Sequence, residues 1–367
     1  MNTPIPAWMA RATELTRAGR LVEATAMIQS ALQGTPATPV RTPSAAGPGE
    51  DVIDVVARVV DGPAAAPPDT QAGATVRPPQ EARPDGAFVA GRHTGPAGSR
   101  AYKLYVPSGA AAHPLPLLVM LHGCTQDPDD FARGTQMNAL AQQEGFLVLY
   151  PAQARKANTS GCWNWFKHTH QRRGHGEPAL IAGMVEELAT RHRVDRQRVF
   201  VAGLSAGGAM AAIVGRAYPE LFAAVGVHSG LPVGAARDLP SAMAAMQSGA
   251  CSPATPAGGP PTIVFHGDQD ATVHPANGAG VVQACAGGAA RRSESGRSAG
   301  GRDYTRHLHV DAQGMVRAEH WVLHGAGHAW SGGSATGTYT DAAGPDASRE
   351  MLRFFLAHPL PGGPTQD

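Results

Sequence analysis

The chain has 367 residues, a formal net charge of +1 and 43% hydrophobic residues, with Gly and Pro abundant at 45 and 31 residues. A nearly neutral chain lacks the basic surface that nucleic-acid binding requires, so nucleic acid is not expected as a partner. No run of about 18 apolar residues occurs, and no transmembrane segment is expected. The length suits one large catalytic domain with an appendage.

Residues 1–33 are predicted to form an amphipathic helical segment, because apolar residues such as Trp8, Leu15 and Ile28 recur at helical spacing among charged ones. Gly19 is a candidate point of division into two shorter helices. The segment has no signal-peptide hydrophobic stretch, which favours a cytoplasmic location as the default. Secretion by a route that is not visible in the sequence is the alternative.

Residues 34–83 are rich in Pro, Ala, Thr and Gly. Such a stretch buries too little apolar surface to offset its chain entropy, so a disordered linker is predicted here. Residues 84–367 are then expected to form the catalytic domain. This gives three parts: a helical segment, a linker and a domain.

Four cysteines occur, at positions 124, 162, 251 and 285, and their spacing matches no zinc-binding pattern. Free thiols are expected in the cytosol. If the cysteines are oxidised, their order in the chain suggests that Cys124 pairs with Cys162 and Cys251 with Cys285.

Short apolar runs alternate with longer helical stretches after residue 84. The alternation is typical of parallel strands joined by crossover helices, and it predicts an α/β fold, a mostly parallel sheet with helices on both faces. The expected strands are 86–91, 100–107, 115–121, 145–150, 198–203, 222–228, 262–266 and, as the last one, 320–324; the expected helices are 179–191, 206–218 and 348–357.

Ser205 is the predicted nucleophile, because residues 203–207 read GLSAG and fit the pattern G-x-S-x-G. The motif follows the strand RVFVA and opens an Ala-rich helix. A Ser at the tip of a tight strand-to-helix turn is typical of a nucleophile elbow, and the glycines permit the crowded backbone. A glycine-rich turn with an incidental Ser is the alternative that this context disfavours.

The turn LHGCTQ at residues 121–126 follows an early strand and is predicted to supply one backbone N–H to an oxyanion hole. Cys124 is the expected donor, with Gly123 as the neighbouring possibility. The second donor is the N–H of Ala206, the residue after the nucleophile.

The acid that orients the base is expected in the loop HGDQDATV, where either Asp268 or Asp270 qualifies. Asp270 is preferred because it lies nearer the loop tip, and Asp268 is expected to brace the loop. His328 is the predicted base, since it lies in a loop of small residues just past the last predicted strand, whereas His324 is expected to be structural. The order Ser205, Asp270, His328 is that of α/β-hydrolases. No cofactor and no metal are implied.

Three aromatic residues in four positions, Trp163, Trp165 and Phe166, are unusual in a chain with 5% aromatic residues. They predict the lining of an apolar or extended substrate site, with core packing as the alternative. Trp330, two residues past His328, is also predicted to contact substrate.

Several motifs in one order resemble the poly(3-hydroxybutyrate) depolymerase family of esterases, which also includes feruloyl and acetyl-xylan esterases. The resemblance covers roughly residues 85–357 and implies a nucleophile at Ser205, an acid at Asp270, a base at His328 and an oxyanion donor at Cys124. It rests on LHGCTQ at 121–126, GCWNWF at 161–166, GLSAGG at 203–208, HGDQDATV at 266–273 and GAGHAW at 325–330.

The leading hypothesis is therefore a serine esterase that hydrolyses polyester or oligomers of 3-hydroxybutyrate through an acyl-enzyme. A feruloyl or acetyl-xylan type of carbohydrate esterase, or a general short-chain carboxylesterase, is the alternative. A non-catalytic granule-binding protein is an alternative of another class. The helical N-terminal segment resembles that of intracellular members of the family, which implies association with the surface of polyhydroxyalkanoate granules.

Overall fold

The computed structural model describes residues 86–109, 113–250 and 258–361. The predictions for residues 1–33, for residues 34–83 and for the pairing of Cys251 lie outside these ranges.

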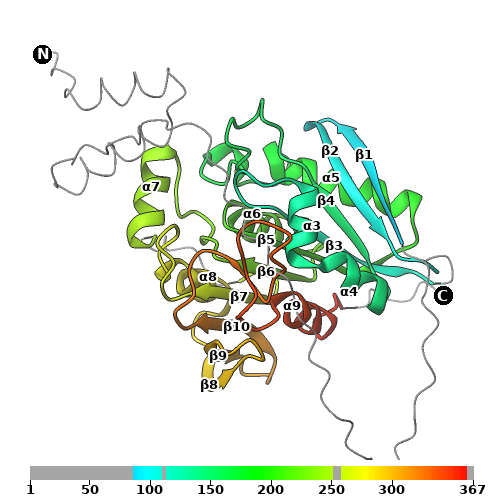
Figure 1. The fold of residues 1–367 in the computed structure, drawn as a ribbon. Helices are drawn as coiled ribbons and strands as arrows, with labels where there is room; N and C mark the ends of the chain where they lie inside the picture. The colour runs from blue at the N-terminus through cyan, green and yellow to red at the C-terminus, as the bar shows by residue number, and fades with distance from the viewer. Residues whose placement is uncertain (1–85, 110–112, 251–257, 362–367) are drawn as a thin grey trace, which may run out of the picture. The chain divides into compact units, whose positions relative to one another are not determined.

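The described residues form a ten-stranded sheet in the order β1-β2-β4-β3-β5-β6-β7-β10-β9-β8 (Figure 1). The six neighbouring strands from β4 to β10 are parallel, and antiparallel strands flank them on both edges. The bounds are β1 Ala87–Gly95, β2 Gly98–Val106, β3 Leu115–Leu121, β4 Leu147–Pro151, β5 Val194–Leu204, β6 Ala224–His228, β7 Thr262–Gly267, β8 Ala290–Arg297, β9 Asp303–Val310 and β10 Val316–Leu323.

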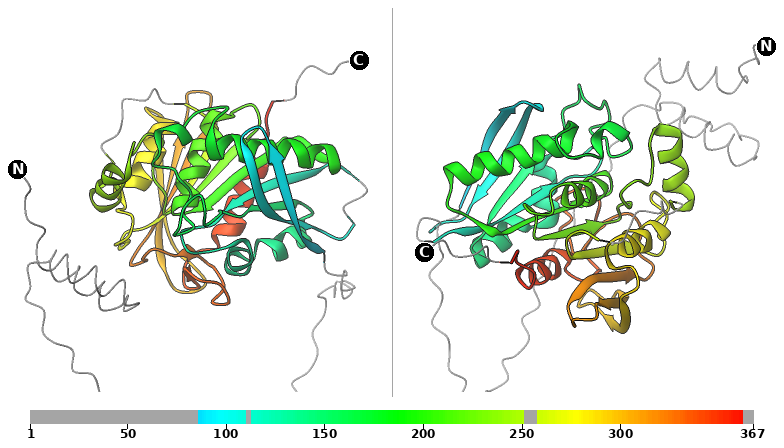
Figure 2. Two further views of the ribbon diagram at one scale, coloured as in Figure 1. Left: turned by 90° about the horizontal axis from the view of Figure 1, so that it is seen from above. Right: turned by 180° about the vertical axis from the view of Figure 1, so that it is seen from behind.

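Helices lie on both faces of this sheet (Figures 1 and 2). One face packs against α5, α6 and α8, and the other against α3, α4 and α9. The bounds are α3 Pro128–Thr135, α4 Met137–Glu144, α5 Gly176–Arg191, α6 Ala206–Ala217, α7 Leu239–Ser248, α8 Ala276–Ala286 and α9 Ala347–Leu356. Among the described residues, no helix is both long and apolar enough to cross a bilayer.

Strand β3 shows why the sheet needs helices on both sides. Leu117, Val119 and Leu121 belong to the core under α5 and α6, whereas Leu118 and Met120 belong to the core under α9. All five side chains are at most 1% exposed. Successive residues of a strand point to opposite faces, so a continuous apolar run is stable only where both faces are covered.

The predicted strands and helices that fall within the described ranges are confirmed, with ends that differ by a few residues. One prediction was wrong: residues 320–324 are not the last strand, because the short strands β11 Trp330–Ser331 and β12 Thr340–Asp341 follow and pair with each other. The hairpin of β8 and β9 was not predicted. Its strand β8, ARRSESGR, is almost wholly exposed and lacks the apolar alternation that identifies a half-buried strand.

The parallel strands bring the candidate site together. Their carboxyl ends share one edge of the sheet, and in open α/β sheets ligands bind beyond this edge. The loops after β3, β5, β7 and β10 therefore converge, and they carry the predicted oxyanion turn, nucleophile, acid and base.

Candidate active site

Ser205 lies in the turn between β5 and α6, with φ 58° and ψ −120°. This backbone conformation is unfavourable for a residue other than glycine and persists only where surrounding contacts impose it. The flanking positions, Gly203 and Gly207, are glycines for a steric reason. A Cβ at either position would collide with backbone atoms, including the carbonyl oxygen of Leu121. The pattern G-x-S-x-G is thus a packing requirement of this turn.

The predicted base and acid lie side by side. His328, in the loop after β10, has its Nδ1 2.7 Å from Oδ2 of Asp270, in the loop after β7. An ionised carboxylate only accepts hydrogen bonds, so Nδ1 of His328 carries the hydrogen and donates it. The Nε2 atom of the neutral ring then has a free lone pair, which is the form that a general base needs.

The side chain of Asp270 is 0% exposed, and its carboxylate accepts several hydrogen bonds. The N–H groups of Thr272 and Val273 donate to Oδ1 at 2.9 and 2.8 Å, and the Nε2 of His266 lies 3.4 Å from Oδ2. Burial alone would raise the pKa of Asp270, but the hydrogen bonds from His266 and His328 and the nearby backbone N–H groups hold that pKa well below its ordinary value. The carboxylate is therefore ionised at neutral pH.

Asp268 occupies a different position. It accepts from Nδ1 of His324 at 3.0 Å and from the N–H of Gly325 at 2.7 Å, so it connects the loop after β7 to the start of the loop that carries His328. The structure thus pairs Asp270 with His328 and Asp268 with His324. These are the contacts expected if Asp270 is the acid and Asp268 braces the loop; both roles stay predictions.

His228, at the end of β6, was missed by sequence reasoning. Its carbonyl accepts from the N–H of Ser205 at 2.8 Å, and its Nε2 accepts from the N–H of Ser331 at 3.0 Å. The Nδ1–H therefore donates to Ser229 Oγ at 3.2 Å. Burial lowers the pKa of His228 well below its ordinary value, so the ring is neutral. One buried residue thus connects the nucleophile turn to the segment just past His328; its only sequence signal was its place at a strand end.

The structure distinguishes between the two predicted oxyanion donors of the turn after β3. The N–H of Gly123 already donates to the side chain of Gln126 at 2.9 Å, and the N–H of Thr125 donates to Ser160 O at 2.9 Å. Within the described residues no acceptor is found for the N–H of Cys124. Ala206 is the first residue of α6, where an N–H has no partner inside its helix. Cys124 and Ala206 thus each retain an N–H that is able to bind an oxyanion.

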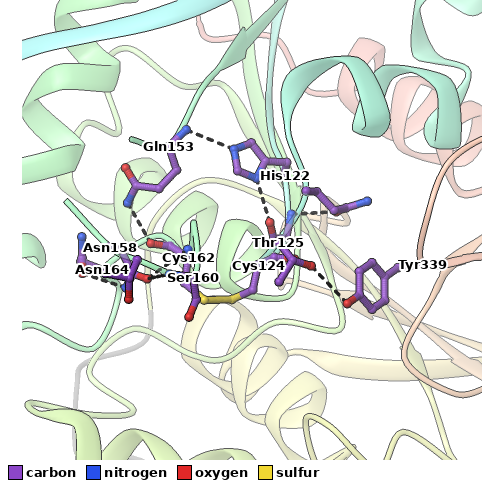
Figure 3. The surroundings of a disulfide bond; sticks show 12 residues. His122, Cys124, Thr125, Gln153, Asn158, Ser160, Cys162, Asn164 and Tyr339 are labelled. Carbon is purple, nitrogen blue, oxygen red and sulfur yellow. Dashed lines mark hydrogen bonds between the residues drawn. A yellow bond between two sulfur atoms is a disulfide. The ribbon is translucent and has the colours of Figure 1, made fainter. Parts of the chain in front are cut away.

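A disulfide joins Cys124, in the oxyanion turn at residues 121–126, to Cys162, in the loop of residues 161–166 (Figure 3). This second loop carries Trp163, Trp165 and Phe166 and is called the aromatic loop below. This is the pair expected for an oxidised chain; free thiols were expected only for a cytosolic location. Among the described residues Cys285 has no disulfide partner, and burial raises the pKa of its thiol to about 11.

The predicted substrate-contacting tryptophans are buried. Trp163, Trp165 and Trp330 are 1%, 5% and 1% exposed. Trp330 packs between the rings of Phe131 and His228 at centroid distances of 5.5 and 5.2 Å. Such burial favours the alternative of core packing, since an open substrate site needs exposed ring surface; contact with substrate stays a prediction.

Glu177, at the start of α5, forms hydrogen bonds with the aromatic loop. Sequence reasoning did not single out this residue. It is 1% exposed, and its carboxylate accepts from the backbone and side-chain N–H groups of Asn164, both at 2.7 Å, and from Nε2 of Gln153 at 2.6 Å. Burial would raise the pKa of Glu177, but these bonds and that of His170 lower it. Within the described residues no cluster of three or more His, Cys, Asp or Glu is arranged to hold a metal ion.

The chain is similar in sequence to known esterases. The family described as Esterase PHB depolymerase matches residues 100–286, which is about half of the chain. The chain is 32% identical over 252 residues to Poly(3-hydroxyalkanoate) depolymerase C of Paucimonas lemoignei, covering 64% of this chain and 59% of that protein. It is 35% identical over 142 residues to Probable acetylxylan esterase A of Aspergillus fumigatus, covering 38% and 36%. The chain thus spans less than two thirds of the length of these relatives.

Two solved structures are similar in fold. The acetyl xylan esterase from Aspergillus awamori superposes with a TM-score of 0.55 at 22% identity, covering 73% of this chain and 99% of that one. An S-formylglutathione hydrolase from Agrobacterium tumefaciens superposes with a TM-score of 0.50 at 13% identity, covering 75% and 96%. At these identities the likeness concerns the fold, which is that of α/β-hydrolases.

Proposed function

The chain belongs to the PHB depolymerase family of esterases, and on that premise we propose that it is a serine hydrolase of carboxylic esters with Ser205 as its nucleophile. The observation that carries the proposal is the pairing of His328 with Asp270 at 2.7 Å, on the same sheet edge as the strained turn of Ser205. A structural turn has no need of a buried, ionised acid that fixes the tautomer of a histidine.

The reaction proceeds in two steps. His328 Nε2 takes the proton of Ser205 Oγ as the oxygen attacks the ester carbonyl carbon, and Asp270 stabilises the imidazolium. The N–H groups of Cys124 and Ala206 bind the resulting oxyanion. Collapse of this intermediate breaks the bond to the alcohol, which leaves with the proton from His328. Water, deprotonated by His328, then attacks the acyl-Ser205 ester and releases the acid.

A polyester or oligomer of 3-hydroxybutyrate is the proposed substrate. The relative named as a poly(3-hydroxyalkanoate) depolymerase aligns with 64% of the chain, whereas the relative named as an acetylxylan esterase aligns with 38%. An acetylated or feruloylated carbohydrate is the second candidate, favoured by the names of the relatives that include Feruloyl esterase B of Thermothelomyces thermophilus. Binding of residues 1–33 to a polymer granule is a separate proposal, which applies only if the protein is cytoplasmic.

The proposed location is an oxidising compartment, which was the alternative in the sequence analysis. The reason is the disulfide between Cys124 and Cys162 next to the proposed oxyanion donor, because disulfides persist outside the reducing cytosol. Alkylation of the protein from fractionated cells, followed by mass spectrometry, tests this. Two alkylated thiols at Cys124 and Cys162 in a cytosolic fraction would overturn it.

The deciding experiment is release of 3-hydroxybutyrate from amorphous poly(3-hydroxybutyrate) by the wild type and by Ser205→Ala. Release that disappears in the variant supports both the nucleophile and the substrate. If the wild type releases nothing but still hydrolyses p-nitrophenyl butyrate, the esterase is retained and the polyester is discarded in favour of carbohydrate esters. Deletion of residues 1–83 tests granule binding, which unchanged association with granules would contradict.

A further inference from the structure

Tyr339, in the loop between β11 and β12, is the only strongly exposed aromatic residue in the part of the chain that the structure describes, with 47% of its surface exposed. The tryptophans that sequence reasoning favoured for substrate contact are buried. Tyr339 points toward Thr125 of the oxyanion turn (Figure 3), and its Oη lies 3.2 Å from Thr125 Oγ1.

The direction of this hydrogen bond follows from the neighbouring one. Thr125 Oγ1 donates its single hydrogen to Cys124 O at 2.6 Å, so toward Tyr339 it only accepts. The phenol O–H of Tyr339 is therefore the donor. With its hydroxyl hydrogen engaged, the residue presents the apolar face of its ring beside the turn.

Both partners are held in an unfavourable backbone conformation. Tyr339 has φ 52° and Thr125 has φ 66°, the left-handed region that non-glycine residues seldom adopt. Ser205 and Ser229, at the same end of the parallel strands, also have positive φ, 58° and 48°. Strain of this kind persists only where other contacts impose it, and it gathers at functional sites.

The contacts that impose it tie the loop of Tyr339 to the oxyanion turn and to α3. The side chain of Gln126 donates to Thr338 O at 3.1 Å, and the N–H of Thr338 donates to Asp130 Oδ1 at 3.1 Å. Gly337 lies so close to Gly134 of α3 that a Cβ on it would collide with that backbone. The loop is therefore fixed in place, and the ring of Tyr339 is pre-organised.

We infer that Tyr339 is a specificity-determining residue whose ring contacts the part of an ester substrate that extends beyond the reacting carbonyl. The inference rests on the proposed function, in which Cys124 binds the oxyanion. Because Thr125 follows Cys124 directly, a carbonyl bound there places the rest of its chain near Tyr339. The fixed, half-exposed apolar ring fits an extended aliphatic ester, such as successive 3-hydroxybutyrate units.

The test compares kcat and KM for a minimal and an extended substrate, p-nitrophenyl acetate and the trimer of 3-hydroxybutyrate. Tyr339→Asn removes the ring and keeps a residue type that tolerates positive φ. It should raise KM for the trimer about fivefold, the size of one lost aromatic contact, and change kcat/KM for the acetate little. Tyr339→Phe keeps the ring and should retain the wild-type preference for the trimer.

Met315→Asn is the matched control. Met315 is 52% exposed and precedes β10, so it lies at the end of that strand opposite the site. Met315→Asn should leave kcat and KM for both substrates unchanged. An equal loss on both substrates in Tyr339→Asn, or no loss, would overturn the inference. If the wild type does not cleave the trimer, the ratio of p-nitrophenyl octanoate to acetate hydrolysis decides on Tyr339 by the same criterion, and release from amorphous polymer decides separately on the polyester.

Discussion

At the scale of single residues, the turn of Ser205 depends on positions where the backbone leaves no room for another side chain. Gly203 and Gly207 lie where any side chain would strike backbone, and Ser205 between them adopts a conformation that costs about 1–3 kcal/mol. Asp268 and Asp270 lie two residues apart in one loop, but Asp270 contacts His328 whereas Asp268 contacts His324. Chemistry at this scale is decided by distances of a few ångströms.

Gly207→Ala is expected to destabilise the fold by more than about 2 kcal/mol, because the new Cβ would strike the carbonyl oxygens of Leu121 and His122, and backbone cannot yield as a side chain can. Urea denaturation measures the effect. Gly327→Ala is the matched control: it lies beside His328, and an added Cβ meets nothing within 4 Å. Equal stability of the two variants would contradict the steric explanation of the motif.

Asp270→Asn is expected to lower kcat by about 10⁴, because an amide fixes the wrong tautomer of His328 and does not stabilise its cation. Asp268→Asn should lower kcat by less than about tenfold, since Asp268 contacts His324 and Gly325 instead. Steady-state kinetics on p-nitrophenyl butyrate compare the two. A larger loss for Asp268→Asn would assign the acid to that residue.

At the scale of elements, the site is built from loops that depend on one another. The aromatic loop is joined to the oxyanion turn by the bond from Cys162 to Cys124, and to α5 by the contacts of Asn164 with Glu177. The oxyanion turn is also tied to the loop of Tyr339 through Gln126 and Thr338. These contacts fix the loops relative to one another, so a change in one loop is expected to shift its neighbours.

Glu177→Gln is expected to destabilise the protein by about 2–4 kcal/mol, because an NH₂ group would replace a buried acceptor that faces N–H donors. The measurement is the free energy of unfolding in urea. Glu186→Gln on the same helix is the control, since Glu186 is 53% exposed in its ion pair with Arg196 and should cost less than about 1 kcal/mol. Similar losses would show that burial of Glu177 is not the cause.

At the scale of the whole molecule, buried histidines make the fold sensitive to acid. Burial lowers the pKa values of His122, His228 and His320. The pKa of His320 falls to about 3, because the nearby rings of His266, His307 and His309 add to the effect of burial. In the unfolded chain these histidines bind protons once the pH falls below about 6.5, the ordinary pKa of a histidine side chain. In the folded chain they stay neutral to a lower pH. Stability is therefore complete above that pH and is lost as the pH falls from about 6.5 toward 3.

His320→Leu is expected to flatten this dependence, because one proton that the unfolded state alone takes up is removed. The slope of unfolding free energy against pH between 6 and 4 should fall by up to about 1.4 kcal/mol per pH unit. Urea titrations at several pH values measure it. Lowered carboxylate pKa values, such as that of Asp270, act in the same direction only at lower pH and remain in the variant. An unchanged slope would contradict the assignment.

The sequence by itself determined the central strands, the α/β class and the turn of Ser205. These follow from local patterns: a continuous apolar run such as 115–121 is stable only as a buried strand, and G-x-S-x-G between a strand and a helix permits one turn. The candidate loops for the acid and the base followed from their order after successive parallel strands, without any knowledge of distances.

Tertiary structure alone decided what depends on contacts between distant segments. It paired His328 with Asp270, engaged the N–H of Gly123 and left that of Cys124, and buried the tryptophans that composition had suggested for substrate contact. It also brought Tyr339 to Thr125, 214 positions earlier in the chain. The hydrophobic pattern of a segment indicates its secondary structure and its buried face. A hydrogen-bond partner from a distant segment depends instead on how strands, helices and loops pack together.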